Sequence, residues 1–276
     1  MGKNDSSKYR VLPLMRKINE VNRDFSRELA ILLNCLELDG KSKKSFTSDS
    51  LTGKIEVCYT DKDNNTKEKG LRQSKDYMIK LVETLRDDYK KREYSRRYNR
   101  SSTRNDFYSS DIDDRCKIAN GYIERIKSFY SNNKSDNIGR QTWSFEGDTY
   151  PDIFIETEKY IIVAEGKWTE GKRTSSTTHL KNRDQLIRHI QGAIEYRRNH
   201  QIENKLIIGF YIVNRKDILD RNFPITEKDF EDIIDKEDIQ MSNKDLLLES
   251  YYGCTDWETI GDKFNLVFED VAKDEY

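Results

Sequence analysis

The sequence predicts an α/β protein built around a small sheet, and three observations lead to that class. Apolar residues recur at three- and four-residue steps in several long segments, as in amphipathic helices. Other apolar stretches are short and alternate with polar residues or run continuously, as in strands. Between residues 116 and 213 the expected order is helix, three strands, helix, strand, in which the second helix crosses over between strands.

The amino-terminal region begins with a strongly apolar periodic segment. After Pro13, residues 14–38 resemble one long helix. Its apolar face either packs against the rest of the chain or forms the seam of a homodimer. Residues 54–60 alternate like a short strand, and a second helix is expected over 74–98.

The end of that second helix is basic. Residues 90–104 contain seven Lys or Arg side chains, including Arg96 and Arg97, against the single acidic residue Glu93. Tyrosines are interleaved with them. Such a surface suits phosphate contacts with occasional base stacking, and its alternative is a solvated helix end.

Charge divides the chain into unlike parts. The net charge is −1, but residues 216–276 contain 18 acidic and 7 basic side chains, so a basic body precedes an acidic end. Any polyanion is therefore expected to meet the front of the chain. We expect a helical, partly basic region over 1–115, a core over 116–213 and an acidic extension over 214–276.

Two function classes are disfavoured by composition. No run approaches the roughly 18 apolar residues of a membrane span, so no membrane partner is expected. The four cysteines are widely spaced, without a zinc-like pair or a dense disulfide framework. A reduced, cytoplasmic protein is the simplest interpretation.

The core elements follow from periodicity. Helices are expected over 116–130 and 181–199, and strands over 141–146, 152–155, 160–164 and 205–213. In the extension, Thr226 followed by Asp229 resembles a capping box for a helix over 227–235, and Asp256 could cap a turn.

The candidate chemistry lies at the end of the central hairpin. Pro151-Asp152 opens one strand, and Glu165-Gly166-Lys167 ends the next. If Ile155 faces Tyr160, Asp152 is a diagonal neighbour of Glu165. Glu165 and Lys167 share a face because strand side chains alternate.

Two carboxylates on a rigid strand pair suit Mg²⁺, which prefers oxygen ligands and keeps several waters. A nearby ammonium can orient a water and offset charge on a phosphate. The set therefore favours metal-assisted phosphodiester hydrolysis over acyl transfer, for which no G-x-S-x-G motif is present. The alternative is a solvent-facing salt bridge at a strand end.

These residues resemble the motif of the PD-(D/E)xK nuclease superfamily, with Pro151-Asp152 as its PD and Glu165-Gly166-Lys167 as its (D/E)xK. The resemblance covers about residues 116–213 and implies a restriction-endonuclease-like core. It implies that Asp152 and Glu165 bind Mg²⁺, for which Mn²⁺ could substitute, that the Gly166 carbonyl completes the ligands, and that Lys167 assists the nucleophilic water.

Further residues are drawn in by the same resemblance. Some exonuclease-like members carry Gln followed four residues later by Tyr, and here Gln185 is followed by His189. Gln185 is a candidate catalytic residue, and both side chains are expected to support the site or contact the substrate. Glu124 or Glu146 is the expected third carboxylate. Flanking phosphates are expected to contact Lys172, Arg173, Arg183, Arg188 and His189, and Arg96 and Arg97 of the basic segment are also expected to bind nucleic acid.

The expected function is a Mg²⁺-dependent DNA endonuclease, with RNA the less favoured substrate. A homodimer is expected because double-strand cleavage needs two sites, and a role in prokaryotic antiviral defence or restriction follows from the family's habits. Two alternatives remain: a nuclease fold that binds nucleic acid without turnover, and a partner-regulated subunit whose acidic end engages a protein or screens the basic cleft.

Overall fold

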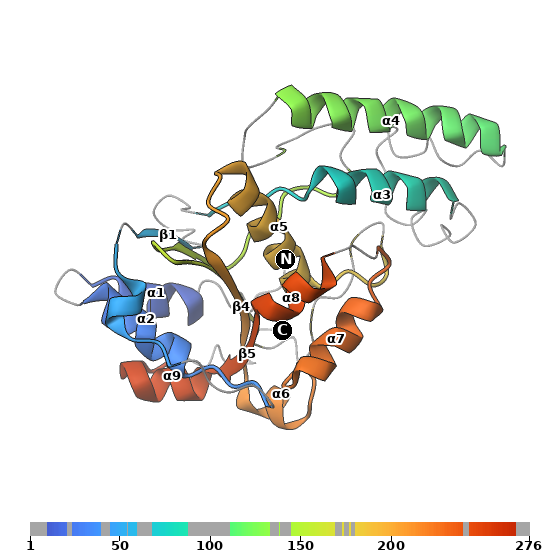
Figure 1. Cartoon of the computed structure of the whole chain (residues 1–276). Helices are drawn as coiled ribbons and strands as arrows, with labels where there is room; N and C mark the ends of the chain where they lie inside the picture. The colour runs from blue at the N-terminus through green and yellow to red at the C-terminus, as the bar shows by residue number, and fades with distance from the viewer. Residues whose placement is uncertain are drawn as a thin grey trace, which may run out of the picture.

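The structure is a computed structural model of the 276-residue chain. The residues that it describes are 10–20, 24–39, 45–53, 55–59, 68–87, 111–132, 138, 145–168, 173, 177, 180–239 and 243–268. They form a mixed α/β fold in which helices cover both faces of one sheet (Figure 1).

The helices are α1 (Leu12–Ile18), α2 (Phe25–Asn34), α3 (Lys75–Asp87), α4 (Ile112–Asn132), α5 (Gln185–Asn199), α6 (Arg215–Leu219), α7 (Glu227–Asp235), α8 (Lys244–Ser250) and α9 (Trp257–Phe264), with a short 3₁₀ helix, η2 (Ser48–Leu51). The strands are β1 (Glu56–Tyr59), β2 (Ile153–Glu156), β3 (Tyr160–Gly166), β4 (Leu206–Val213) and β5 (Tyr251–Asp256). None of the helices in the described ranges combines the length and the apolar composition that crossing a bilayer requires.

The sheet is mixed, and its strand pairing changes from antiparallel to parallel at the central strand, β3. Its order is β1-β2-β3-β4-β5, antiparallel from β1 to β3 and parallel from β3 to β5. A tight connection joins β2 to β3, and the Thr157 hydroxyl accepts the Tyr160 amide across it at 2.9 Å. The parallel pair β3–β4 needs a crossover, which α5 supplies. The carboxyl end of β3 therefore lies beside the start of α5.

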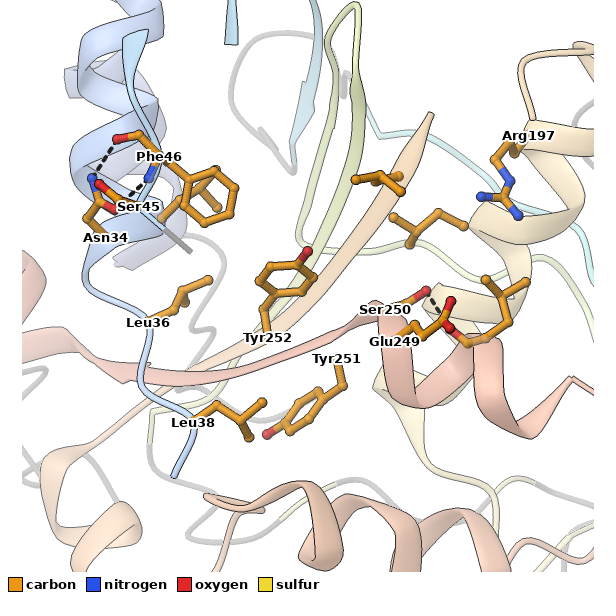
Figure 2. A pocket seen from close by; sticks show the side chains of 14 residues that line it. Asn34, Leu36, Leu38, Ser45, Phe46, Arg197, Glu249, Ser250, Tyr251 and Tyr252 are labelled. Atoms are coloured by element: carbon orange, nitrogen blue, oxygen red, sulfur yellow. Dashed lines mark hydrogen bonds between the residues drawn. The ribbon is translucent and has the colours of Figure 1, made fainter. Parts of the chain in front are cut away.

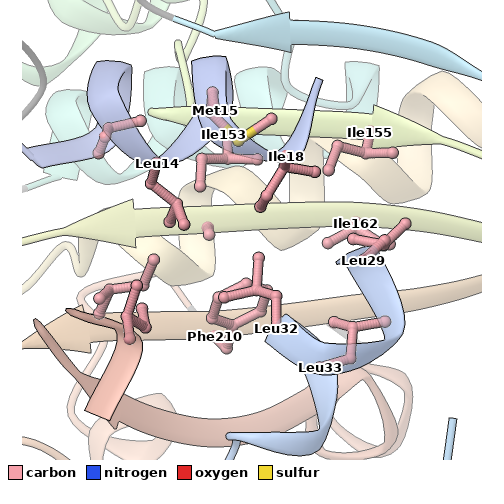
Figure 3. Close-up of a cluster of buried hydrophobic side chains, with 14 of the residues drawn as sticks. Leu14, Met15, Ile18, Leu29, Leu32, Leu33, Ile153, Ile155, Ile162 and Phe210 are labelled. Carbon is pink, nitrogen blue, oxygen red and sulfur yellow. The ribbon is translucent and has the colours of Figure 1, made fainter. Parts of the chain in front are cut away.

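Strand side chains alternate between the two faces of the sheet. Each face packs against a different set of helices. On one face, Ile153, Ile162 and Phe210 pack with α1, α2 and α9 (Figure 3). On the other face, Val163 and Tyr211 pack with α5, α7 and α8. The continuous apolar patterns of β3 and β4 are thus explained by burial on both faces.

The helices α3 and α4 pack mainly against each other. They lie side by side in Figure 1, and their apolar faces meet in a third cluster that contains Tyr77, Leu81 and Tyr122. The helix predicted over 116–130 is confirmed as α4, but it does not contribute to either of the sheet's apolar clusters. The amino-terminal helices α1 and α2 cover the sheet face that contains Ile153, Ile162 and Phe210.

Most of the other predicted elements are confirmed with small shifts. The strand patterns correspond to β1, β2, β3 and β4, and the helix over 227–235 is α7 with its Thr226–Asp229 capping box. Asp256 caps α9 by accepting the Thr259 amide at 2.8 Å. The predicted helix over 74–98 is α3 as far as Asp87, and the rest of it, with Arg96 and Arg97, lies outside the described residues.

Two local predictions are wrong. Of the strand predicted over 141–146, residues 145–146 form a bend and residues 141–144 lie outside the described ranges. Besides β3, the strand that pairs with β2 is β1, from much earlier in the chain. The crossover helix begins at Gln185 rather than at residue 181, because Asp184 takes the extended N-cap conformation and accepts the first amides.

The single helix predicted over 14–38 is also wrong. The chain forms α1 and α2, with residues 21–23 between them outside the described ranges. Leu14, Leu29 and Leu32 are fully buried against the sheet of the same chain. The apolar face proposed as a dimer seam is therefore occupied inside the protein.

The carboxy-terminal region is part of the same core. The strand β5 pairs with β4, and Phe230, Trp257 and Phe264 are buried. Removing residues from Asp217 onward would remove the edge strand β5 and these buried aromatic rings from the core. Such a deletion would test folding rather than electrostatic screening by the acidic end.

Gly253 offers a test of how the amino-terminal region docks on β5. Its φ is +92°, and a Cβ there would lie 1.9 Å from the Glu37 carbonyl oxygen, beside the Glu37–Cys254 backbone bonds. We expect Gly253→Ala to lower the free energy of unfolding by about 2–4 kcal/mol, measured by urea denaturation.

Gly121→Ala is the matched control, because nothing lies within 4 Å of a Cβ built on this residue of α4. It should raise stability by about 0.5–1 kcal/mol through helix propensity. Equal changes in the two variants would contradict the close approach at Gly253.

Candidate functional site

The pairing of β2 with β3 brings the two predicted carboxylates together. Ile153 pairs with Ala164, so the next residues along, Asp152 and Glu165, occupy adjoining positions just beyond the ladder. The predicted register, in which Ile155 faces Tyr160, was wrong by two residues, since Ile155 pairs with Ile162. In the observed register, Asp152 is opposite Glu165 and not diagonal to it.

Asp152 extends the ladder with its side chain. Its Oδ2 atom accepts the Gly166 amide at 2.8 Å. A Cβ on Gly166 would lie 3.0 Å from the Val11 side chain and 3.2 Å from the Trp257 ring. Gly166 is therefore a small residue at a position of β3 that packs closely against Val11 and Trp257.

Glu165 and Lys167 face α5, as their two-residue spacing predicts. The Lys167 ammonium lies 2.7 Å from Glu165 Oε1 and donates to Gln185 Oε1 at 3.3 Å. Glu165 and Lys167 are only 2% and 6% exposed, whereas Asp152 and Gln185 are half-buried. The alternative of a solvent-facing salt bridge is therefore excluded by burial.

His189 lies one helical turn after Gln185 and reaches Glu165. Its Nε2 atom is 2.9 Å from Glu165 Oε2, and its Nδ1 atom is 2.6 Å from the Thr149 hydroxyl. Burial, followed by the nearby Arg188 guanidinium, lowers the pKa of His189 to about 3, so the imidazole is neutral at pH 7. Because a carboxylate only accepts, Nε2 carries the proton and Nδ1 accepts from Thr149.

Asp184 fixes the start of α5 and hence the position of Gln185. Its Oδ1 atom accepts the amides of Leu186 and Ile187 at 3.0 and 3.2 Å and the Tyr211 hydroxyl at 2.6 Å. Its Oδ2 atom pairs with Arg173 at 2.6 Å. Arg173, predicted to contact phosphate, is thus bound to the helix cap.

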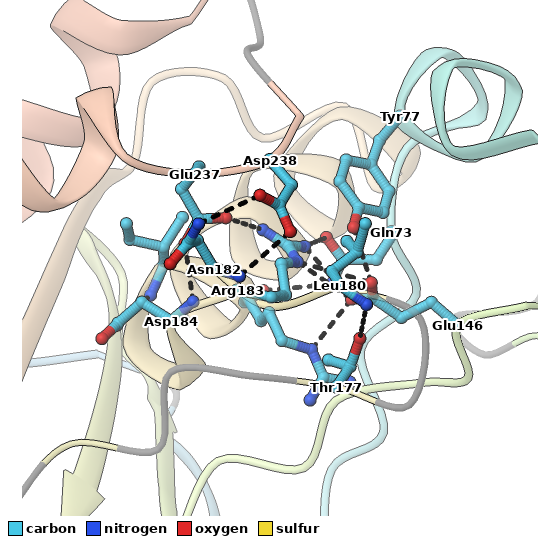
Figure 4. A network of polar contacts seen from close by, with 12 residues as sticks. Gln73, Tyr77, Glu146, Thr177, Leu180, Asn182, Arg183, Asp184, Glu237 and Asp238 are labelled. Atoms are coloured by element: carbon cyan, nitrogen blue, oxygen red, sulfur yellow. Dashed lines mark hydrogen bonds and ion pairs between the residues drawn. The ribbon is translucent and has the colours of Figure 1, made fainter. Parts of the chain in front are cut away.

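A second buried network lies beside this cap and centres on Arg183 (Figure 4). The Arg183 guanidinium pairs with Glu146 at 3.1 Å and with Glu237 at 3.0 Å, and it donates to Gln73. The Tyr77 hydroxyl of α3 donates to Glu146 at 2.6 Å. One guanidinium therefore joins α3, the start of α5 and the segment after α7.

The two carboxylates of this network have opposite pKa shifts. Burial alone would raise the pKa of Glu146, but Arg183, Arg188 and the Tyr77 hydroxyl bring it below its ordinary value. Burial raises the pKa of Glu237 to about 7 and outweighs the attraction of Arg183.

Neither candidate third carboxylate is placed with the pair. Glu124 is exposed on α4 and bound to Lys127 at 2.9 Å, because α4 packs on α3 rather than on the sheet. Glu146 is buried, but both its oxygens accept from arginine or tyrosine side chains. Its charge neutralises Arg183 and Arg188.

The predicted phosphate contacts are mostly engaged inside the protein. Arg183 and His189 are fully buried or nearly so and cannot reach a polyanion. Arg173 and Arg188 are partly exposed and are paired with Asp184 and Glu146. Lys172 lies outside the described residues.

Three residues that hold the candidate site in place were not predicted from the sequence: Thr149, Asp184 and Trp257. The Trp257 indole donates to the Lys167 carbonyl at 2.7 Å. An Asp one residue before an apolar helical stripe signals an N-cap, so Asp184 could have been recognised. Thr149 and Trp257 act across long sequence separations, and no local pattern marks them.

The residues at the hairpin end offer oxygen donors to a metal ion. Across the described ranges, no group of three or more His, Cys, Asp or Glu side chains could hold a metal ion. Mg²⁺ does not need one, because it commonly takes one or two carboxylates together with waters and phosphate oxygens. Asp152 and Glu165 supply carboxylate oxygens, which are the donors that Mg²⁺ prefers. The pair fits Mg²⁺.

A separate cavity of about 610 Å³ lies at the opposite end of the parallel strands (Figure 2). It is lined by Leu36, Phe46 and Tyr252 and by Leu206 and Ile207 at the start of β4, whereas the carboxylates follow the end of β3. Its lining is mainly apolar, and it contributes no residue to the carboxylate pair.

The Glu146 network yields a stability prediction. Glu146→Gln should lower the free energy of unfolding by about 3 kcal/mol, because it leaves two guanidinium groups facing a neutral amide. Glu124→Gln, on the exposed face of α4, should change it by less than about 0.5 kcal/mol. Urea denaturation of both variants measures the difference, and equal effects would contradict the structural role of Glu146.

Glu237 yields a pH prediction. In the folded protein, the Glu237 carboxyl keeps its proton up to about pH 7, whereas in the unfolded chain it loses the proton near its ordinary pKa of 4.5. The folded state therefore binds more protons between these values, and this residue's contribution to stability falls as pH rises through the window. Glu237→Gln should remove that fall. Unfolding curves of both proteins at several pH values measure it, and parallel pH profiles would refute the shift.

Comparison of the chain with protein-family models, curated proteins and solved structures found no match. The residues at the ends of β2 and β3 are therefore the basis for assigning a function.

Proposed function

We propose that the protein is a metal-dependent nuclease that hydrolyses phosphodiester bonds of DNA. The observation that supports this most directly is the meeting of Asp152, Glu165 and Lys167 at the end of one hairpin. DNA rather than RNA is chosen because the motif resembles that of the PD-(D/E)xK nucleases.

Asp152 and Glu165 would hold the cation in this proposal, with the Gly166 carbonyl as a further oxygen. When bound, Mg²⁺ would stabilise charge on the phosphate and favour ionisation of an attacking water. Glu165 belongs to β3, and Asp152 directly precedes β2 and accepts the Gly166 amide, so little reorganisation would be needed for binding.

Lys167 would act on the attacking water. Its ammonium is fixed by Glu165 and by Gln185, and an ammonium has three donors to share among its acceptors. It would orient the water and offset negative charge that develops as the new P–O bond forms and the bond to the leaving oxygen breaks. Gln185 would hold the amine in place.

The substrate would approach from the more open side of the pair. Asp152 and Gln185 are half-buried, while Glu165 and Lys167 lie deeper. A scissile phosphate would thus meet Asp152 first. Among the predicted cations that the structure describes, Arg173 and Arg188 retain partial exposure and could contact neighbouring phosphates.

Isosteric substitutions test the proposal. Asp152→Asn and Lys167→Met should each lower Mg²⁺-dependent cleavage of DNA by at least about 100-fold, because each removes a charge that acts on the transition state. Linear, circular and single-stranded DNA are incubated with Mg²⁺, Mn²⁺ or EDTA, and the products are separated on gels.

Lys127→Met is the matched control, since Lys127 is an exposed lysine on α4 far from the hairpin in sequence and in packing. It should cleave like the unsubstituted protein. Undiminished cleavage by both Asp152→Asn and Lys167→Met would refute the assignment of the site. Binding of DNA without cleavage by the unsubstituted protein, in either metal, would favour a nuclease fold without turnover.

A further inference from the structure

His189 is placed where it cannot contact a substrate. It has no exposed surface, so of its two predicted roles, supporting the site and contacting nucleic acid, only the first is compatible with its position. Both ring nitrogens have partners inside the protein, Glu165 on one side and Thr149 on the other. A buried polar ring with both nitrogens satisfied fixes the groups that it contacts.

The helix α5 presents two side chains to the end of β3. Gln185 and His189 are four residues apart and therefore share a helix face. Gln185 meets Lys167, and His189 meets Glu165. Asp184 caps α5 and so fixes where the helix begins, which sets the positions of Gln185 and His189 beside the end of β3.

Thr149 is itself anchored. Its amide donates to the Leu71 carbonyl and its carbonyl accepts the Leu71 amide, both at 2.9 Å, and its side chain is buried. Both backbone groups are thus bonded to Leu71, and the hydroxyl is directed to His189 Nδ1. The hydroxyl holds the ring in the orientation that presents Nε2–H to the carboxylate.

Glu165 is consequently restrained at both oxygens. Oε1 lies 2.7 Å from the Lys167 ammonium, and Oε2 lies 2.9 Å from His189 Nε2. These two contacts fix the rotation of the carboxylate plane beside Asp152. A carboxylate ligand held by such outer contacts loses less freedom when it binds a cation.

We propose that His189, oriented by Thr149, is a positioning residue that holds the Glu165 carboxylate ready for a divalent cation. This inference rests on the proposed nuclease function, because it assigns the cation to Asp152 and Glu165. It differs from a packing role in one respect: the donor at Nε2, rather than the volume of the ring, is what matters.

Direct binding of Mn²⁺ tests it without DNA. Titration calorimetry of the full chain should show that His189→Leu weakens Mn²⁺ binding about 10- to 100-fold. His189→Gln should recover most of the affinity, because its amide can donate near the position of Nε2. Thr149→Val keeps His189 and should weaken binding in the same direction by a smaller factor.

His200→Leu is the control, since His200 is exposed at the end of the same helix. It should bind Mn²⁺ like the unsubstituted protein. Thermal unfolding confirms that each variant is folded at the titration temperature, and kcat for DNA cleavage should fall in the same order as affinity.

The outcomes separate the two proposals. If the unsubstituted protein binds no Mn²⁺ and cleaves no DNA, the proposed function fails and the positioning role fails with it. If it binds and cleaves, but His189→Leu and Thr149→Val keep their affinity within about twofold, only the positioning role is overturned. Equal losses in His189→Leu and His189→Gln would indicate packing and would also overturn it.

Discussion

The pairing of β2 with β3 constrains everything that the candidate site requires. Because side chains alternate along a strand, a slip of one residue would turn Glu165 and Lys167 toward α1 and α9 and away from α5. The register is held by burial on both faces and by the bond from the Gly166 amide to Asp152. The same contact that ends the ladder therefore places one carboxylate beside the other.

The site depends on distant segments that lock this hairpin end. Trp257 of α9 binds the Lys167 carbonyl, and Thr149 connects His189 to the segment before α3. The guanidinium of Arg10 lies 3.4 Å from the Trp168 ring centroid. Residues from both ends of the described chain thus surround the segment 165–167, and the acidic carboxy-terminal part is integral to its packing.

Around the start of α5, the charged side chains that the structure describes are organised as internal pairs. Arg183, Arg188 and Arg173 are matched with Glu146, Glu237 and Asp184 around the start of α5. Buried pairs of this kind add little net stability over an apolar core but are costly to break, so they favour one arrangement of α3, α5 and the segment after α7. For these three arginines, a count of basic residues along the sequence therefore overstates the charge that a polyanion would meet.

The sequence by itself determined the strands of the central hairpin, several amphipathic helices such as α4 and α7, and the candidate residues Asp152, Glu165 and Lys167, because these follow from local periodicity and spacing. It did not determine the register of the hairpin or the division of residues 14–38 into α1 and α2. Only the tertiary structure decided which strand lies next to β2, that Glu124 is remote, that Glu146 neutralises arginines and that His189 supports Glu165. The physical reason is that long-range packing selects among many acidic and basic residues with equivalent local patterns, and a charge is drawn to whichever partner burial leaves beside it.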